Sequence, residues 1–182
     1  RSTLDRSSAA SDVYKRQDIK MKVSIVMGSK SDLELANAAG EILEILGVEY
    51  SINILSAHRT PELLHAHIDE AIESGVRVFI GIAGLAAHLA GNVASKTTLP
   101  VIGVPGDGGP LNGFDALLST VQMPKGVPVA TVAIGKAGAI NAGHLAAQIL
   151  SVADEGLQNS ISKARKANKE QLKKENDELQ GS

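Results

Sequence analysis

Short apolar segments alternate with longer amphipathic segments along most of the chain. The short segments are rich in Val and Ile and almost continuously apolar, which is typical of strands buried on both faces of a sheet. The longer segments place Ala, Leu and Ile three and four residues apart, which is the spacing of a buried helix face. The expected strands span 23–27, 52–55, 76–82, 101–104 and 127–134, and the expected helices span 31–46, 61–74, 86–96, 113–121 and 138–153.

This alternation of strands with helices predicts the fold class. Parallel strands joined by helical crossovers form a sheet that is covered on both faces. We therefore expect an α/β fold, a three-layer α/β/α sandwich with a five-stranded parallel sheet that is flavodoxin-like, followed by a C-terminal helix. A chain of 182 residues fits one domain, which we place over residues 21–155.

Both ends of the chain depart from the pattern. Residues 1–20 are rich in Ser and charge and have neither an apolar signal-peptide core nor a fold pattern, so we interpret them as an extraneous or disordered leader. Residues 156–182 carry an amphipathic stripe that weakens towards the end, so this helix or tail can bury little against its own domain. We expect it to lie on a neighbouring subunit; the alternative is a solvated tail that frays after about Ala167.

The composition narrows the classes of function. The absence of Cys excludes disulfides, thiolate zinc sites and cysteine nucleophiles. The net charge is −2 and no broad basic stripe is present, which argues against a nucleic-acid partner. No apolar run approaches about 20 residues, so no membrane partner is expected, and no spacing of His and carboxylates resembles a metal site. The expected ligand is a small molecule.

In an open parallel sheet, ligands bind beyond the carboxyl ends of the strands. After the first expected strand, Gly28 forms a turn that is followed by Ser29, Ser31 and Asp32 at the start of a helix. The free N–H groups of such a helix start favour an anion such as phosphate, the hydroxyls can donate, and the carboxylate can accept from ribose hydroxyls. A plain helix N-cap is an equally good interpretation of this loop.

The loop after the second expected strand carries a stronger signal. Thr60 and Pro61 mark a helix start, which places Ser56, His58 and Arg59 at the ligand-binding edge. An imidazole can both give and take a proton near neutral pH, and a guanidinium offers a fixed cation for phosphate or carboxylate. The alternative is a histidine that only stabilises its own loop.

The loop after the third expected strand is built from small residues, so a ligand can approach its backbone closely. It runs from Gly84 through Ala86 and Ala87 to His88 and Leu89, and the helix expected from residue 86 would present free N–H groups. A planar base fits against such a surface. His88 is either part of this pocket or a packed, hydrogen-bonded histidine.

The remaining candidates carry weaker signals. The segment 105–113 is too rich in Gly and Pro to be regular and is interpreted as a mobile lid, with a plain connecting loop as the alternative. We interpret His65, His67 and His144 as surface or packing residues, because they lie within expected helices.

Taken together, the motifs resemble one family from about residue 22 to residue 150. It is the 5-(carboxyamino)imidazole ribonucleotide mutase family, class I, also called the catalytic subunit of phosphoribosylaminoimidazole carboxylase. The segments that carry the resemblance are MGSKSD, SAHRTPE, AGLAAHLAG, LPVIGVP, LNGFDALLSTVQMPKGVPVATVAIG and KAGAINA.

The resemblance implies a cytoplasmic enzyme of purine biosynthesis that uses no metal or organic cofactor and forms homo-octamers. Its reaction converts 5-(carboxyamino)imidazole ribonucleotide to the 4-carboxy-5-aminoimidazole ribonucleotide through carbon dioxide held in the pocket. His58 would be the general acid and base. The substrate would be held by the side chains of Ser29, Asp32, Ser56 and Arg59, and by His88 beside the backbone N–H groups of Gly84, Ala86 and Ala87.

The match departs from the family pattern at two places. Leu85 stands where the family usually has a Gly, and the loop 106–110 differs from the common form. A sister class carboxylates 5-aminoimidazole ribonucleotide directly with carbon dioxide and typically carries Arg-Ser-Asn after Ala-Gly, which is absent here, so the mutase is favoured.

Two hypotheses from different functional classes stay open. One is a non-catalytic nucleotide- or flavin-binding module that uses the same loops only to hold a phosphate. The second is a receiver-type signalling domain, which expects an acidic cluster after the first strand, where Gly28 and Ser29 stand instead. A binding module needs the cation of Arg59 but not the imidazole of His58, so His58 discriminates it from an enzyme.

Overall fold

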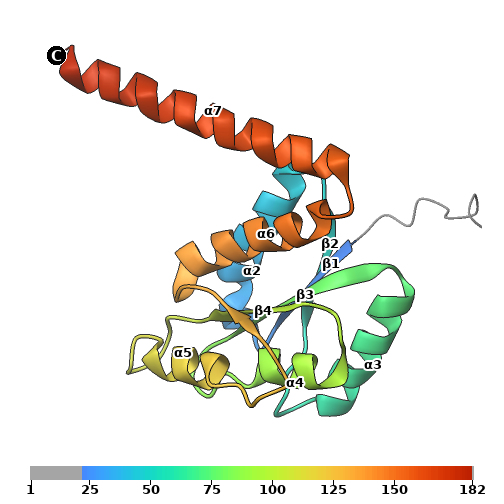
Figure 1. Cartoon of the computed structure of the whole chain (residues 1–182). Coiled ribbons are helices and arrows are strands. Elements are labelled where there is room, and N and C mark those ends of the chain that lie inside the picture. The colour runs from blue at the N-terminus through green and yellow to red at the C-terminus, as the bar shows by residue number, and fades with distance from the viewer. Residues whose placement is uncertain (1–21, 182) are drawn as a thin grey trace, which may run out of the picture.

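In a computed structural model of the chain, residues 22–181 are described and form a sheet with helices on both faces (Figure 1). All strands pair in parallel in the order β2-β1-β3-β4-β5, which confirms the predicted three-layer α/β/α sandwich. The strands are β1 (Lys22–Met27), β2 (Glu49–Ile54), β3 (Val76–Ala83), β4 (Val101–Pro105) and β5 (Ala130–Thr131). The helices are η1 (Lys30–Asp32), α2 (Leu33–Ile45), α3 (Pro61–Glu73), α4 (Leu89–Lys96), α5 (Phe114–Val121), α6 (Gly135–Ser151) and α7 (Glu155–Gln180). The expected leader, residues 1–20, lies outside the described residues.

Two expected elements differ from the structure. The strand expected over 127–134 is reduced to the two residues of β5, because only this part pairs with β4 at the sheet edge. The helix expected from residue 86 begins at Leu89, since a turn from Leu85 to His88 precedes it.

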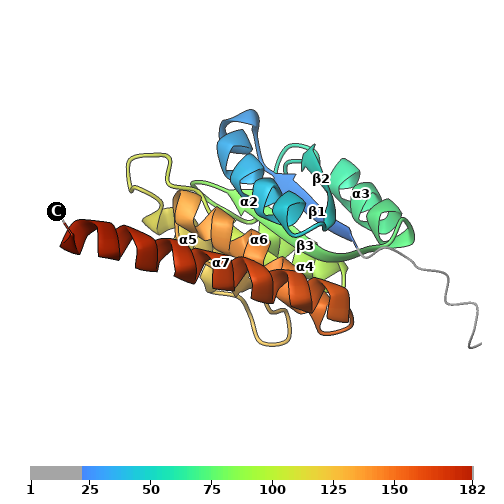
Figure 2. The same ribbon diagram turned by 90° about the horizontal axis from the view of Figure 1, so that it is seen from above.

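The two faces of the sheet make two separate cores, because neighbouring residues of a strand point to opposite faces. Ile25 packs on the face covered by α2 and α6, where Leu43 is buried. Val26 packs on the other face with Phe79 and Leu64, beneath α3 and α4. Figure 2, seen from above, shows α2 and α6 beside each other over one face.

Helix α4 lies very close to β3. A Cβ atom built on Gly81 would lie 2.9 Å from the Cα atom of Ala90, so only glycine allows this approach. The contact fixes the start of α4, and with it His88, relative to the carboxyl end of β3.

Helix α7 extends away from the body of the protein (Figure 1). Its start is capped by the Asp154 carboxylate, which accepts a hydrogen bond of 2.9 Å from the Leu157 N–H. Leu157 is its one buried residue among those described, and Ile161 and Ala164 pack partly against the α6 side of the core. The helix continues to Gln180, and whether it lies on a neighbouring subunit or is solvated stays a prediction. Within residues 22–181, no helix is long and apolar enough to cross a membrane.

Candidate active site

Four loops meet at the carboxyl edge of the sheet, and they enclose a cavity of about 800 Å³. We call them the first loop (28–32), the second loop (55–60), the third loop (84–88) and the fourth loop (106–113), following β1, β2, β3 and β4 respectively. Among the residues predicted from the sequence as site residues, the cavity is lined by Ser29, Ser31, Asp32, Ser56, His58, Arg59, Gly84, Ala86, His88 and Leu89. The sheet therefore brings these predicted residues together, while their roles remain predictions.

Ala87 is the exception. Its side chain is buried, it does not line the cavity, and its N–H donates a hydrogen bond of 2.9 Å to the Leu85 carbonyl. This N–H closes a turn, because the helix begins three residues later than expected, and the contact of Ala87 with the ligand stays a prediction.

The first loop is organised around the Asp32 carboxylate. Its Oδ2 accepts hydrogen bonds from the Ser29 N–H at 3.2 Å and the Ser29 hydroxyl at 3.3 Å, and the Ser29 hydroxyl also contacts the Ser31 hydroxyl. Burial raises the pKa of Asp32 above its ordinary value of 3.8, although these serine hydrogen bonds and the charge of Arg59 act in the opposite direction. A ligand that donates hydroxyl hydrogen bonds would stabilise the ionised carboxylate.

The second loop is held rigidly by its own hydrogen bonds and tied to the first. The Thr60 hydroxyl accepts from the Ser56 N–H at 3.0 Å, and the Thr60 N–H donates to the Ser56 carbonyl at 2.9 Å. The Arg59 side chain donates from Nη2 to the Gly28 carbonyl at 2.7 Å and from Nε to the Ser56 hydroxyl at 3.3 Å. The guanidinium is thus fixed between two loops and keeps further N–H groups for an anion.

His58 and His88 meet across the cavity. The Nε2 atom of His58 lies 2.9 Å from the Nδ1 atom of His88, and the rings contact each other edge to face. One of these nitrogens donates and the other accepts, so the tautomer of one ring fixes that of its partner. The pair gives His58 a defined orientation in a cavity that also carries a cation, hydroxyls and a carboxylate.

Sequence reasoning missed three charged residues that line the cavity. Lys136 and Glu34 form an ion pair of 3.4 Å, and Asp107 belongs to the fourth loop. Lys136 follows the last strand at the start of α6, so the rule that ligands bind at the carboxyl edge would have identified it. Glu34 carried no comparable signal. Among residues 22–181, no group of three or more His, Asp or Glu side chains is placed to hold a metal ion.

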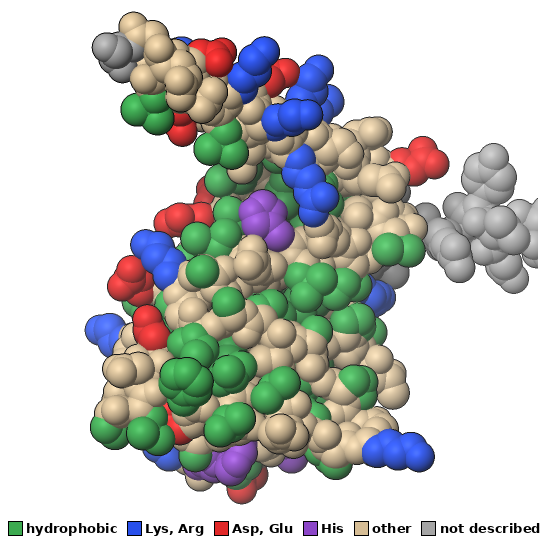
Figure 3. Space-filling model, turned by 60° about the vertical axis from the view of Figure 1, so that its left-hand side comes forward, with side chains coloured by type: hydrophobic (Ala, Val, Ile, Leu, Met, Phe, Trp, Pro, Cys, Tyr) green, Lys and Arg blue, Asp and Glu red, His purple; other side chains and the backbone are tan. Residues whose placement is uncertain are grey.

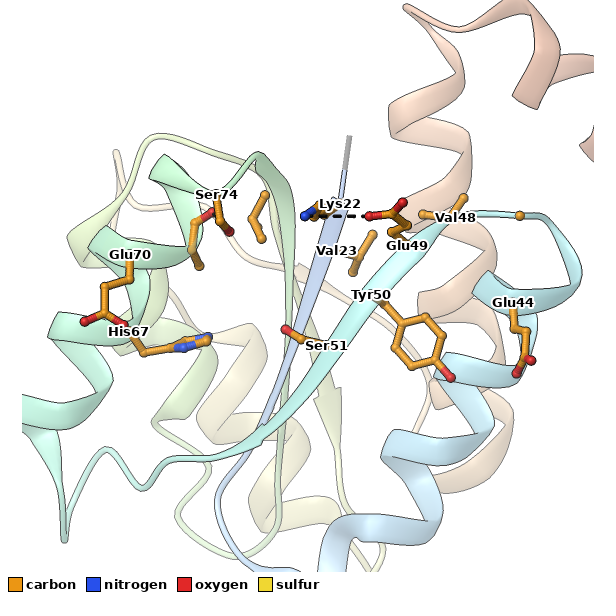
Figure 4. A pocket seen from close by; sticks show the side chains of 13 residues that line it. Lys22, Val23, Glu44, Val48, Glu49, Tyr50, Ser51, His67, Glu70 and Ser74 are labelled. Carbon is orange, nitrogen blue, oxygen red and sulfur yellow. Dashed lines mark hydrogen bonds and ion pairs between the residues drawn. The ribbon is translucent and has the colours of Figure 1, made fainter. Parts of the chain in front are cut away.

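A second cavity, of about 780 Å³, lies at the opposite edge of the sheet and is shown in Figure 4. Lys22 and Glu49 form an ion pair of 3.6 Å there, and His67 projects from α3 towards the strands. The His67 Nε2 atom hydrogen bonds the buried Ser24 hydroxyl at 2.9 Å, and burial lowers the pKa of His67, partly offset by the charge of Glu70. Although the cavities are similar in size, we place the chemistry in the first one, because only it gathers the loops at the carboxyl ends of the strands.

Comparison with known proteins shows the family to which the chain belongs. The sequence profile described as AIR carboxylase matches residues 22–171. The N5-carboxyaminoimidazole ribonucleotide mutase of Bacillus subtilis is 53% identical, and the match covers 86% of this chain and 97% of that protein. The N5-carboxyaminoimidazole ribonucleotide mutase of Escherichia coli K12 is 50% identical, and the match covers 83% of this chain and 89% of that protein. The crystal structure of Treponema denticola PurE superposes with a TM-score of 0.78 at 30% identity, covering 87% of this chain and 98% of that one. The chain belongs to the AIR carboxylase family.

Proposed function

We propose that this chain is a cytoplasmic N5-carboxyaminoimidazole ribonucleotide mutase of purine biosynthesis. The observation that carries the proposal is the hydrogen-bonded pair of His58 and His88 in a cavity that also presents Arg59 and the hydroxyls of the first loop. The relatives that share about half of its residues bear the name of this activity.

The proposed reaction moves one carboxylate within the substrate. The N–C bond of the carbamate breaks as His58 donates a proton to the departing nitrogen, which gives an amine and carbon dioxide. The carbon dioxide then forms a C–C bond at ring carbon C4, and His58 takes up the C4 proton. One imidazole can perform both proton transfers, because it donates in the first step and accepts in the second.

The remaining polar groups suit a ribonucleotide. The Arg59 guanidinium supplies a fixed charge for the phosphate, and Ser29, Ser31 and Ser56 add hydroxyl donors nearby. The Asp32 carboxylate is placed to accept hydrogen bonds from ribose hydroxyls. The aminoimidazole ring would lie against Gly84, Ala86 and Leu89 of the third loop and the start of α4, beside His88.

We also propose that the protein is a homo-oligomer, with an octamer as the expected form. Four apolar side chains along one stripe of α5 and the segment before it are at least 46% exposed: Leu111, Phe114, Leu118 and Val121. Figure 3 shows apolar side chains gathered on the face that carries α5. Such a stripe is typical of a subunit interface. Residues 21–155 would form the catalytic domain, and residues 156–182 would lie on a neighbouring subunit.

The test separates catalysis from binding. His58→Asn should keep the affinity for the substrate within a few-fold, measured by calorimetry with the non-reacting 5-aminoimidazole ribonucleotide, and should lower kcat by about 100-fold or more. A non-catalytic nucleotide-binding module would bind equally well and show no turnover in the unsubstituted protein either. Direct carboxylation of 5-aminoimidazole ribonucleotide is disfavoured, because Leu85-Ala86-Ala87 stands where that class carries Arg-Ser-Asn.

A further inference from the structure

Leu85 adopts a backbone conformation that leucine rarely takes. Its φ is 55°, and among residues 22–181 only Asn112 shares a positive φ without being glycine. A side chain in this left-handed region crowds its own backbone, so such residues tend to persist only where the surroundings or the function hold them. The Leu85 side chain is also 55% exposed, and it lines the cavity. An exposed leucine that lines a cavity lies at its opening.

The Leu85 side chain reaches the fourth loop. A Cβ atom built on Gly109 would lie 2.6 Å from the Cδ2 atom of Leu85, so the leucine occupies the space that a side chain there would fill. Gly109 has a φ of 88°, which glycine adopts without strain. The fourth loop is anchored beside it, because the Gly106 N–H donates to the Ala83 carbonyl at 2.8 Å. Leu85 therefore bridges two loops at the cavity opening.

We propose that Leu85, seated on Gly109, closes the opening of the cavity and retains the carbon dioxide formed during the reaction. This inference rests on the proposed mutase activity. Between cleavage of the N–C bond and formation of the C–C bond, the carbon dioxide is not covalently attached, and it is lost if it diffuses out or meets water. An apolar side chain across the opening hinders both, because it blocks the path and excludes water. Leu85 is assigned no part in breaking or forming bonds; it is a positioning residue that confines an intermediate.

The test measures how often carbon dioxide escapes. The protein converts N5-carboxyaminoimidazole ribonucleotide in buffer that contains carbon-13 bicarbonate and carbonic anhydrase, which equilibrates escaped carbon dioxide with the label. At initial rates, mass spectrometry gives the labelled fraction of the C4-carboxylated product, and chromatography gives the 5-aminoimidazole ribonucleotide released. The loss of the carbamate in buffer without protein is subtracted.

Leu85→Gly is the main variant, and it should fold, because it removes an exposed side chain and relieves the left-handed backbone. We expect its labelled fraction and its release of 5-aminoimidazole ribonucleotide to rise roughly threefold or more over the unsubstituted protein. Leu85→Met, which can still reach Gly109, should restore retention. Leu63→Ala is the control, because it removes a leucine of similar exposure, 60%, that does not line the cavity. It should change neither the labelled fraction nor the release of 5-aminoimidazole ribonucleotide.

The outcomes separate the inference from the function on which it rests. Equal labelling and equal release in Leu85→Gly and the unsubstituted protein would overturn the inference and leave the mutase activity standing. If the unsubstituted protein makes no C4-carboxylated product, the proposed function fails first, and the inference fails with it.

Discussion

Arg59 offers a quantitative test of substrate binding in the cavity. Its guanidinium is held by the Gly28 carbonyl at 2.7 Å and the Ser56 hydroxyl at 3.3 Å, and its free N–H groups are assigned to the substrate phosphate. Arg59→Ala removes this cation. The loop itself should survive, because the Ser56 N–H and carbonyl are bonded to Thr60, independently of the arginine side chain.

The size of the effect follows from the contact that is lost. A hydrogen bond to a charged group contributes about 1.5–3 kcal/mol, and because Arg59 is exposed to solvent we take the lower part of this range, about 1.5–2 kcal/mol. Since about 1.4 kcal/mol corresponds to a tenfold change in affinity, KM should rise roughly 10- to 30-fold. The value of kcat should change little, because His58 and His88 remain in place. The KM of Arg59→Lys should lie between those of the unsubstituted protein and Arg59→Ala, since one ammonium group cannot bond Gly28 and a phosphate in the same fork geometry.

The assay is steady-state turnover at two ionic strengths. The KM of the unsubstituted protein should rise with salt, and that of Arg59→Ala should respond less, because its phosphate contact is gone. Arg77→Ala serves as the control, since Arg77 donates to the Val76 carbonyl at 2.9 Å, outside the cavity. An unchanged KM in Arg59→Ala, or a loss of kcat at constant KM, would refute the assignment of this side chain to the phosphate.

Three further predictions address the site and the fold. His88→Ala removes the 2.9 Å contact to His58 and should lower kcat about 2- to 10-fold while altering its pH profile; an unaltered profile would show that the pair does not orient His58. The folded protein lowers the pKa of His67 below its ordinary value of 6.5, so the unfolded chain binds the proton first as the pH falls and stability decreases below about pH 6.5. In urea titrations, the free energy of unfolding should fall less between about pH 7 and about pH 5 for His67→Gln than for the unsubstituted protein. Equal decreases in the two proteins would count against this linkage. Gly81→Ala places a Cβ atom 2.9 Å from the Ala90 backbone and should lower the free energy of unfolding by about 1–3 kcal/mol in urea titrations, whereas an unchanged midpoint would mean that α4 shifts freely.

The sequence predicted the strands best where their side chains are buried. Segments buried on both faces of the sheet must be apolar throughout, so β1, β3 and β4 were visible as continuous runs. The loops of the site followed from them, because parallel strands place their carboxyl ends at one edge. At β5 this signal failed, since an apolar run of eight residues contains only two that pair with β4.

Some features of the site depend on contacts that a linear pattern does not contain. The left-handed conformation of Leu85 and its contact with Gly109 arise only when two loops meet, and no residue-type preference predicts a leucine there. The contact between His58 and His88 joins residues thirty positions apart, and the sequence analysis left a structural role open for each of them. The ion pair of Lys136 with Glu34 likewise joins α6 to α2 across the cavity.

The central claim is tested most directly by turnover of the purified protein with N5-carboxyaminoimidazole ribonucleotide, followed as formation of the C4-carboxylated product. A parallel reaction contains 5-aminoimidazole ribonucleotide with bicarbonate at low concentration. We predict fast conversion of the N-carboxylated substrate and no comparable conversion of the 5-aminoimidazole ribonucleotide. Efficient carboxylation of 5-aminoimidazole ribonucleotide by dissolved carbon dioxide, or no conversion of either compound, would contradict the mutase assignment.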